Sequence, residues 1–142
     1  INISAENIPL SVKEREEKTK VEASEVYKRY DLHIHVPDGA TPKDGPSAGI
    51  AMASVISSIL SGKKIRSDVA MTGEISLTGD VLPIGGLKEK LIAAHRADMV
   101  LVLIPQKNFD RDLEDIPKEV RDALEIREVK RIEEVLDIGL VD

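Results

Sequence analysis

The chain has 142 residues, a length that suits one compact domain. Hydrophobic residues make up 42% and aromatic residues only 2%, so the core must be built from Ile, Leu, Val and Ala. Charged residues make up 32% with a net charge of -6, which argues against nucleic acid as the main partner. The absence of cysteine excludes disulfides and thiol catalysis, and no apolar run approaches the ~18 residues that span a membrane. This composition fits a reducing cytoplasm.

The first part of the chain gives weak structural signals. Residues 1–10 fit a short strand or an irregular arm, and residues 13–20 are nearly all charged, which indicates a solvated turn or a frayed helix. From Ala23, apolar and aromatic residues recur at i, i+3, i+4 and i+7, which predicts a short amphipathic helix over 22–31.

Residues 32–36 alternate between apolar and polar side chains and predict a strand that Pro37 ends. His33 and His35 share one face of this strand. Two histidines at this spacing could ligate a metal, but no third ligand is apparent, so ordinary polar contacts are the preferred interpretation. A structural zinc site is not expected from three histidines without cysteine.

A proline-containing loop over 38–46 leads to Ser47, and an apolar run at helical spacing follows as far as Gly62. Ser47 therefore lies at or near the start of a buried helix, where backbone N–H groups lack partners and the helix dipole is positive. Serine most often caps a helix there. It can also serve as a nucleophile beside N–H donors for an oxyanion, and the small Ala48 and Gly49 would permit close approach of a substrate.

The rest of the chain mixes strands and helices. Strands are predicted over 67–72, 99–104 and 126–129, and a hairpin over 74–84 with its turn at Gly79 and Asp80. A turn is predicted over 112–116, and helices are predicted over 87–97 and 132–140. A further helix is predicted to start at Pro117, with Val120, Ala123 and Leu124 facing inward. This mixture predicts a layered α/β or α+β domain.

The helix predicted over 87–97 carries two lysines, Lys88 and Lys90. Its buried stripe is defined by Leu87, Leu91 and Ala94. At ~100° per residue, Lys90 falls within about 60° of the centre of this stripe and Lys88 falls nearer its flank. Lys90 is thus the lysine expected to lose water, and because desolvation lowers the pKa of an amine, it could act as a neutral general base. The alternative is a lysine whose stem is covered while its ammonium stays in solvent.

Three blocks of the sequence resemble the proteolytic domain of Lon proteases, in the same order and at the same spacing. They are residues 42–49 (PKDGPSAG), 71–75 (MTGEI) and 82–91 (LPIGGLKEKL). The resemblance implies an α+β fold, a compact layered domain with a mixed sheet and packed helices. It covers a proteolytic core over 31–142, whereas 1–30 form an atypical N-terminal segment of the same domain, with strands that are truncated or altered relative to the family pattern.

The resemblance also implies a serine endopeptidase with a Ser–Lys dyad. By the matching positions Ser47 is the nucleophile and Lys90 the general base. Thr72 matches a threonine whose hydroxyl helps to hold the lysine amine, although it could be an ordinary strand residue. Asp44 matches an acidic residue of the loop before the serine and could pair with Lys90 in an inactive form. Backbone N–H groups at the start of the Ser47 helix would supply the oxyanion site.

Family members are typically cytoplasmic, ATP-dependent rings, usually hexamers, that degrade misfolded and regulatory proteins. The implied partners are therefore unfolded protein or peptide substrates and further copies of the chain, with no membrane and no nucleic acid. The family binds ATP and Mg on an AAA+ module. The sequence contains no G-x-x-x-x-G-K-S/T loop, so no ATPase module, cofactor or metal is expected in this chain.

Two other functions are compatible with the sequence. The first is a non-catalytic assembly module that keeps the Lon-like core, suggested by the unusual N-terminal segment and the missing ATPase. The second is a nucleotide- or RNA-binding domain of similar layered fold, which the acidity and the scarcity of aromatic residues disfavour.

Overall fold

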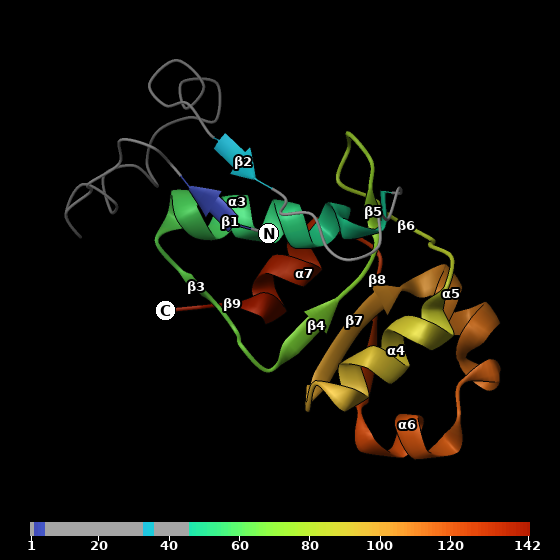
Figure 1. Ribbon diagram of the computed structural model, residues 1–142. Coiled ribbons are helices and arrows are strands. Elements are labelled where there is room, and N and C mark those ends of the chain that lie inside the picture. Colours follow the sequence, from blue (N-terminus) through green and yellow to red (C-terminus); the bar gives the residue numbers. More distant parts are fainter. Residues whose placement is uncertain (1, 5–32, 36–45) are drawn as a thin grey trace.

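The computed structural model describes residues 2–4, 33–35 and 46–142 (Figure 1). The helix predicted over 22–31, the charged turn predicted over 13–20 and the side chain of Asp44 lie outside the described residues.

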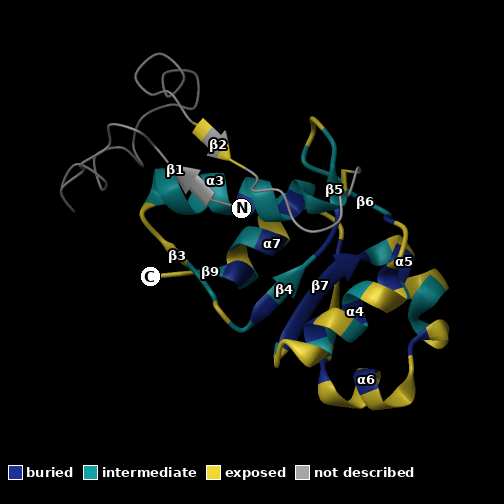
Figure 2. Cartoon of the chain, in the orientation of Figure 1, coloured by how far each residue is buried: buried dark blue, intermediate teal, exposed yellow. Residues whose placement is uncertain are grey.

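A parallel sheet of three strands lies at the centre of the described chain (Figure 1). Its order is β4 (Val69–Met71), β7 (Leu101–Pro105) and β8 (Glu125–Val129). All five residues of β7 are buried, as the dark blue strand in Figure 2 shows. The three predicted strands are confirmed, and β7 has the interior position that its continuous apolar run predicts.

The side chains of β7 alternate between two hydrophobic clusters, one on each face of the sheet. Leu101 and Leu103 belong to a cluster with residues of α3 (Gly49–Ser61) and α7 (Ile132–Gly139). Val102 and Ile104 belong to a cluster with residues of α4 (Leu87–Arg96) and α6 (Lys118–Ala123). Each such side chain contributes roughly 1.5–3 kcal/mol of hydrophobic burial. The sheet is thus the middle of three layers, and the predicted α+β domain is confirmed.

Three short antiparallel pairs complete the described strands. They are β1 (Asn2–Ser4) with β2 (His33–His35), β3 (Lys64–Ile65) with β9 (Leu140–Val141), and β5 (Glu74–Ile75) with β6 (Val81–Leu82). The pair β5–β6 is the predicted hairpin, with shorter strands than the alternation suggests, and β2 is the centre of the predicted strand over 32–36.

The loop of this hairpin is attached to the junction between β8 and α7. Gly79 has φ +88°, a conformation that glycine adopts without strain. The Asp80 carboxylate accepts a hydrogen bond from the Thr78 hydroxyl at 2.9 Å and another from Arg131 Nη1 at 2.8 Å. Arg131 Nη2 also donates to the Thr78 carbonyl at 2.8 Å. The Arg131 guanidinium therefore binds the hairpin turn at two residues, Thr78 before Gly79 and Asp80 after it.

Some predictions about the second half of the chain are wrong in detail. Helix α5 (Gln106–Asp112) is not predicted because its sequence has a single large apolar residue, Phe109, and therefore no stripe. The turn predicted over 112–116 is confirmed as the 3-10 turn η2 (Leu113–Asp115), although Asp112 belongs to α5. Pro117 precedes α6 as its N-cap residue instead of starting it. Of the predicted inward residues of α6, Val120 and Leu124 are buried but Ala123 is exposed, because a helix of six residues presents only a narrow stripe.

The start of α3 lies unusually close to the segment between β4 and β5. A Cβ atom built on Gly49 would lie 3.0 Å from the backbone N of Ile75 and 3.3 Å from the carbonyl O of Gly73. The Ile50 N–H donates to the same Gly73 carbonyl at 3.1 Å. At its other end α3 terminates at Gly62, whose φ of +75° is the left-handed cap that the sequence predicts.

We expect Gly49→Ala to destabilise the protein by about 1–3 kcal/mol, because the added methyl would overlap the backbone of Ile75. In an open helix the same change would instead stabilise by up to about 1 kcal/mol. Gly85→Ala is the control, since a Cβ at Gly85 meets no atom within 4 Å. Denaturant unfolding of each variant measures its change in the free energy of unfolding. An increase for Gly49→Ala would contradict the close approach.

Candidate active site

A cavity of about 230 Å³ lies at the carboxyl end of β4. Its lining residues are Ser47, Ala48, Ala51, Ala70, Met71, Thr72, Lys90, Ala94 and Val102. The cavity therefore brings together residues from all three sequence blocks, and Ser47, Thr72 and Lys90 are their polar members. Ligands of open α/β sheets bind at this same edge, outside the carboxyl ends of parallel strands.

The cavity forms where helices from opposite faces of the sheet meet. α3 packs on one face through Ile50, whereas α4 packs on the other face through Leu87 and Leu91. Between them, β4 is one of the two edge strands of this sheet as described, and its residue Ala70 packs against the cluster on the α4 side. Small side chains along the wall leave a space between the two helices that larger ones would fill.

Ser47 lies in the 3-10 turn η1 (Pro46–Ala48) that leads directly into α3. The N-cap residue of α3 is Ala48, so the structure does not use Ser47 as that cap. The Ser47 carbonyl accepts hydrogen bonds from the Gly73 N–H at 2.9 Å and from the Thr72 hydroxyl at 3.3 Å. The backbone that carries the Ser47 hydroxyl is thus fixed to the end of β4.

Thr72 links the serine to the central strand of the sheet. It is 8% exposed, and its N–H donates to the carbonyl of Leu103 on β7 at 3.1 Å. Its hydroxyl proton is engaged by the Ser47 carbonyl, whereas the two lone pairs of a hydroxyl oxygen can each accept a further hydrogen bond. A neighbouring amine that lines the same cavity can therefore donate to this oxygen.

Lys90 and Lys88 differ in burial as the helical geometry predicts. Lys90 is half-buried and lines the cavity with Ser47, whereas Lys88 is exposed and borders a different hollow beside Arg111. The predicted stripe of α4 is confirmed, since Leu87, Leu91 and Ala94 are all buried. The prediction that Lys90 is the more desolvated lysine is confirmed as well.

Asn108 is a buried polar residue that sequence reasoning missed. It lies on α5 with 0% exposure, and its side-chain amide pairs with both backbone groups of Ile84. Oδ1 accepts from the Ile84 N–H at 2.9 Å, and Nδ2 donates to the Ile84 carbonyl at 2.8 Å. The available signal was a single asparagine three residues after the end of an interior strand, where an amide can replace a missing strand partner.

The second donor of the Asn108 amide is directed at a carboxylate of the same helix. Nδ2 donates to Asp112 Oδ2 at 2.7 Å. Arg111 also pairs with this carboxylate, with Nε 2.8 Å from Oδ1 and Nη2 2.9 Å from Oδ2. The hydrogen bond from Arg111, followed by the one from Asn108, holds the pKa of Asp112 below its usual value.

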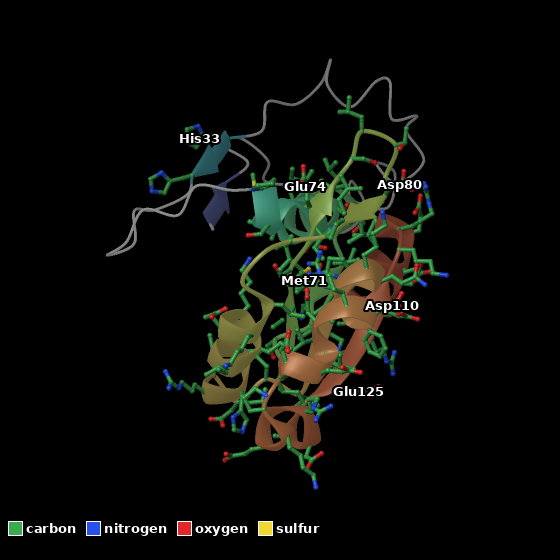
Figure 3. The ribbon with its side chains drawn as sticks, turned by 90° about the vertical axis from the view of Figure 1, so that its right-hand side faces the viewer. His33, Met71, Glu74, Asp80, Asp110 and Glu125 are labelled. Atoms are coloured by element: carbon green, nitrogen blue, oxygen red, sulfur yellow. The ribbon has the colours of Figure 1, made fainter. Side chains whose placement is uncertain are left out.

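The two histidines of β2 are not part of the described cavity. His33 and His35 are both exposed, and His33 projects outward from β2 in Figure 3. Among residues 2–4, 33–35 and 46–142, no three His, Cys, Asp or Glu side chains are grouped so that they could hold a metal ion. None of the described helices is long and apolar enough to cross a lipid bilayer.

The layered fold and the cavity define a class of protein: an α+β domain that presents a serine at a helix start together with a half-buried lysine, the groups used by Ser–Lys hydrolases. The chain belongs to the family of the Lon protease C-terminal proteolytic domain, whose model matches residues 2–142. The resemblance seen in the three sequence blocks is thereby confirmed. The matched range includes nearly all of residues 1–30, and the division of the domain at residue 31 stays a prediction.

Individual relatives are similar over most of this chain. The Lon protease of Campylobacter concisus is 61% identical over 134 residues, which cover 94% of this chain and 17% of that protein. The Lon protease of Helicobacter pylori is 64% identical over 126 residues, which cover 89% of this chain and 15% of that protein. The Lon protease of Escherichia coli is 59% identical over 129 residues, which cover 91% of this chain and 16% of that protein. The chain thus spans less than a fifth of the length of these relatives.

We expect Thr72→Val to lower the free energy of unfolding by about 1 kcal/mol, because it removes the hydroxyl donor to the Ser47 carbonyl. Thr72→Ser is the matched control, since it keeps the hydroxyl and should retain more of the stability. Denaturant unfolding compares the two variants. Equal stability of Thr72→Val and the unchanged protein would show that this hydrogen bond contributes nothing.

We expect acid to remove part of the stability through Asp112. Because its pKa is lowered in the folded state, its contribution is present above the unfolded value of about 3.9 and is lost as pH falls through the folded value. Unfolding free energies measured from pH 7 down to 2.5 should therefore converge for the unchanged protein and Asp112→Asn. Asp110→Asn, an exposed change on the same helix, serves as the control. A difference for Asp112→Asn that stays constant over this range would contradict the assignment.

Proposed function

We propose that this chain is the catalytic domain of a Lon-type serine endopeptidase that cleaves peptide bonds with a dyad of Ser47 and Lys90. The supporting observation is the cavity at the end of β4, which both residues line together with Thr72. The membership of the chain in the Lon proteolytic-domain family supports the same reaction. The non-catalytic alternative has no observation in its favour among the described residues.

The first half-reaction forms an acyl-enzyme. The neutral Lys90 amine takes the proton of the Ser47 hydroxyl while Oγ forms a bond to the scissile carbonyl carbon. The resulting ammonium gives this proton to the leaving nitrogen as the carbon–nitrogen bond breaks. The product with the new amino terminus departs, and the other part of the substrate remains esterified to Ser47.

The second half-reaction releases the acyl group. Lys90 takes a proton from a water molecule, and the hydroxide oxygen forms a bond to the ester carbon. When the ester bond breaks, Lys90 returns the proton to Ser47 Oγ and the enzyme is restored. Histidine, thiol and redox chemistry are not needed in either half-reaction.

Supporting roles are assigned to groups around the dyad. Thr72 Oγ1 accepts a hydrogen bond from the Lys90 amine and so directs the amine lone pair toward Ser47. Backbone N–H groups of the turn that carries Ser47 stabilise the oxyanion. The Ile50 N–H is not among them, because it already donates to the Gly73 carbonyl. Asp44, outside the described residues, pairs with Lys90 in an inactive form and keeps the amine charged.

The larger setting is proposed by analogy with the family, and the named relatives, which are Lon proteases, support the analogy. We propose that unfolded or regulatory proteins are the substrates, that copies of the chain assemble into a ring, usually of six, and that the ring works in the cytoplasm. ATP and Mg act on an AAA+ module and not on the residues of this chain. Nucleic acid and membranes are not among the proposed partners of this domain.

Variants of the dyad test the proposal. We expect Ser47→Ala and Lys90→Met each to lower the rate of cleavage of an unstructured fluorogenic peptide by at least about 10³-fold, because the two groups act as a unit. Lys88→Met removes a lysine from the same helix but not from the cavity, and Ser67→Ala removes an exposed serine. Both controls should retain the rate within about twofold.

A second measurement identifies the nucleophile directly. A serine-directed acyl reagent should label Ser47 in the unchanged protein, and mass spectrometry of the digested protein locates the label. Labelling elsewhere, or full peptide turnover by folded Lys90→Met, would refute the dyad. A folded, assembled sample that neither turns over peptide nor becomes labelled would favour the non-catalytic module.

A further inference from the structure

We propose that Asn108 is a positioning residue for the reaction: its side-chain amide fixes the backbone at Ile84, and thereby the start of α4, so that the amine of Lys90 stays beside Ser47. This inference rests on the proposed function, because it assigns a purpose to the place that Lys90 occupies. Asn108 itself is absent from the cavity lining, so it acts through the helix and not on the substrate.

The amide of Asn108 pairs with both backbone groups of Ile84. Ile84 donates to Oδ1 at 2.9 Å and accepts from Nδ2 at 2.8 Å, which is the pairing that a neighbouring strand would provide. β6 ends at Leu82, so Ile84 lies beyond the last residue of that strand. Asn108 thus continues the support of the chain after the hairpin ends.

The chain after Ile84 needs such support because two glycines separate it from α4. Glycine has more conformational freedom than any other residue, so a glycine pair transmits position poorly unless both flanks are held. Gly86 has φ +70°, and a Cβ at Gly85 would meet no atom within 4 Å. α4 begins immediately afterwards, and its Lys90 N–H donates to the Gly86 carbonyl at 3.2 Å. The first turn of the helix thus joins Lys90 to Gly86, which lies two residues after the held Ile84.

The Asn108 amide also connects the position of Lys90 to the strand that positions Ser47. α5, which carries Asn108, follows β7 without an intervening loop. β7 holds Thr72 through the Leu103 carbonyl at 3.1 Å, and the Thr72 hydroxyl donates to the Ser47 carbonyl at 3.3 Å. Both halves of the site are thus positioned from one buried strand, and Asn108 is the side chain that makes the connection on the lysine side.

The carboxylate of Asp112 fixes the orientation of this amide. It accepts the second Nδ2 hydrogen at 2.7 Å, so rotating the amide by 180° would place Oδ1 against both Asp112 and the Ile84 carbonyl. Asparagine is required for this reason. Asn108→Asp has nearly the same shape but carries no donor, and it would bring two acceptors together at both of these contacts.

The test compares Asn108→Ala and Asn108→Asp with Val120→Ala. Val120 is buried in the hydrophobic cluster that includes Ile84, but it forms no part of the amide pairing, so its truncation controls for general destabilisation. All variants are assayed at a temperature at which circular dichroism shows them folded. We expect both Asn108 variants to lower kcat at least about tenfold with KM within about threefold, since a displacement near 1 Å can cost 10²-fold. Val120→Ala should change kcat less than about threefold.

Two further readouts do not depend on turnover. In Asn108→Ala, amide hydrogen exchange at Ile84 and Lys90 should accelerate at least about tenfold beyond the exchange change of Val120→Ala. The Lys90 ¹³Cε resonance should move toward that of the exposed Lys88. Retained protection of both amides together with an unmoved Lys90 resonance would overturn the positioning role, whether or not peptide is cleaved.

The outcomes separate this inference from the proposed function. If the unchanged protein is not labelled at Ser47 and cleaves nothing, the dyad is refuted, and the exchange and resonance data alone decide whether Asn108 positions Lys90. If the unchanged protein is active and Asn108→Ala keeps kcat within threefold, the positioning role is refuted while the dyad stands. Loss of kcat in both Asn108 variants, with Val120→Ala unaffected, supports both.

Discussion

The contact between the start of α3 and the end of β4 is the constraint on which the described site depends. The Ser47 carbonyl accepts from the Gly73 N–H and the Thr72 hydroxyl, and the Ile50 N–H donates to the Gly73 carbonyl. These bonds form because the two backbones approach closely at Gly49, where a Cβ would lie 3.0 Å from the backbone N of Ile75. At Gly73 the limit comes from packed side chains, since a Cβ there would lie 2.9 Å from Val81 Cγ1. The nucleophile proposed here must be held in a defined position, and the bonds to the end of β4 fix the backbone of Ser47.

The arrangement of helices on the two faces of the sheet explains how a serine and a lysine come together without being neighbours in the chain. Each helix is held by its own hydrophobic cluster, and β7 supplies alternate side chains to both clusters. The two polar groups line the same cavity beside β4, an edge strand of the described sheet, where small residues leave space. The hydrophobic layers that stabilise the fold therefore also set the relative placement of Ser47 and Lys90.

Much of this organisation could be predicted where a pattern is local. The buried stripe of α4, the interior run of β7 and the turn at Gly79 follow from periodicity and from glycine chemistry within a few residues. The burial difference between Lys88 and Lys90 followed from the same helical geometry. The roles of Ser47, Lys90 and Thr72 came from resemblance to the Lon family, and periodicity alone could not have shown that they line one cavity.

The features that escaped prediction depend on partners far away in the sequence. β3 pairs with β9 across more than half of the chain, and neither strand has more than two residues to show alternation. Asn108 lies 24 residues from Ile84. Its place three residues after an interior strand is the one local signal, and the polar segment around it has no apolar pattern that would indicate burial. Ala123 was expected inside because its spacing is helical, but the buried contacts come from Val120 within the short α6 and from Leu124 just after its end.

The Asn108 contact also shows why a polar group is favoured in this part of the core. An apolar residue of similar size would leave the N–H and carbonyl of Ile84 buried without partners, and each such orphan costs about 1–3 kcal/mol. A strand could satisfy them, but β6 ends two residues earlier so that the chain can turn through Gly85 and Gly86 into α4. A side-chain amide reproduces the pairing of a strand at a single residue and lets the chain change direction immediately afterwards. Ile84 is held in this way, and the two glycines after it turn the chain into α4. This arrangement places the first turn of α4, and with it Lys90, against the cavity.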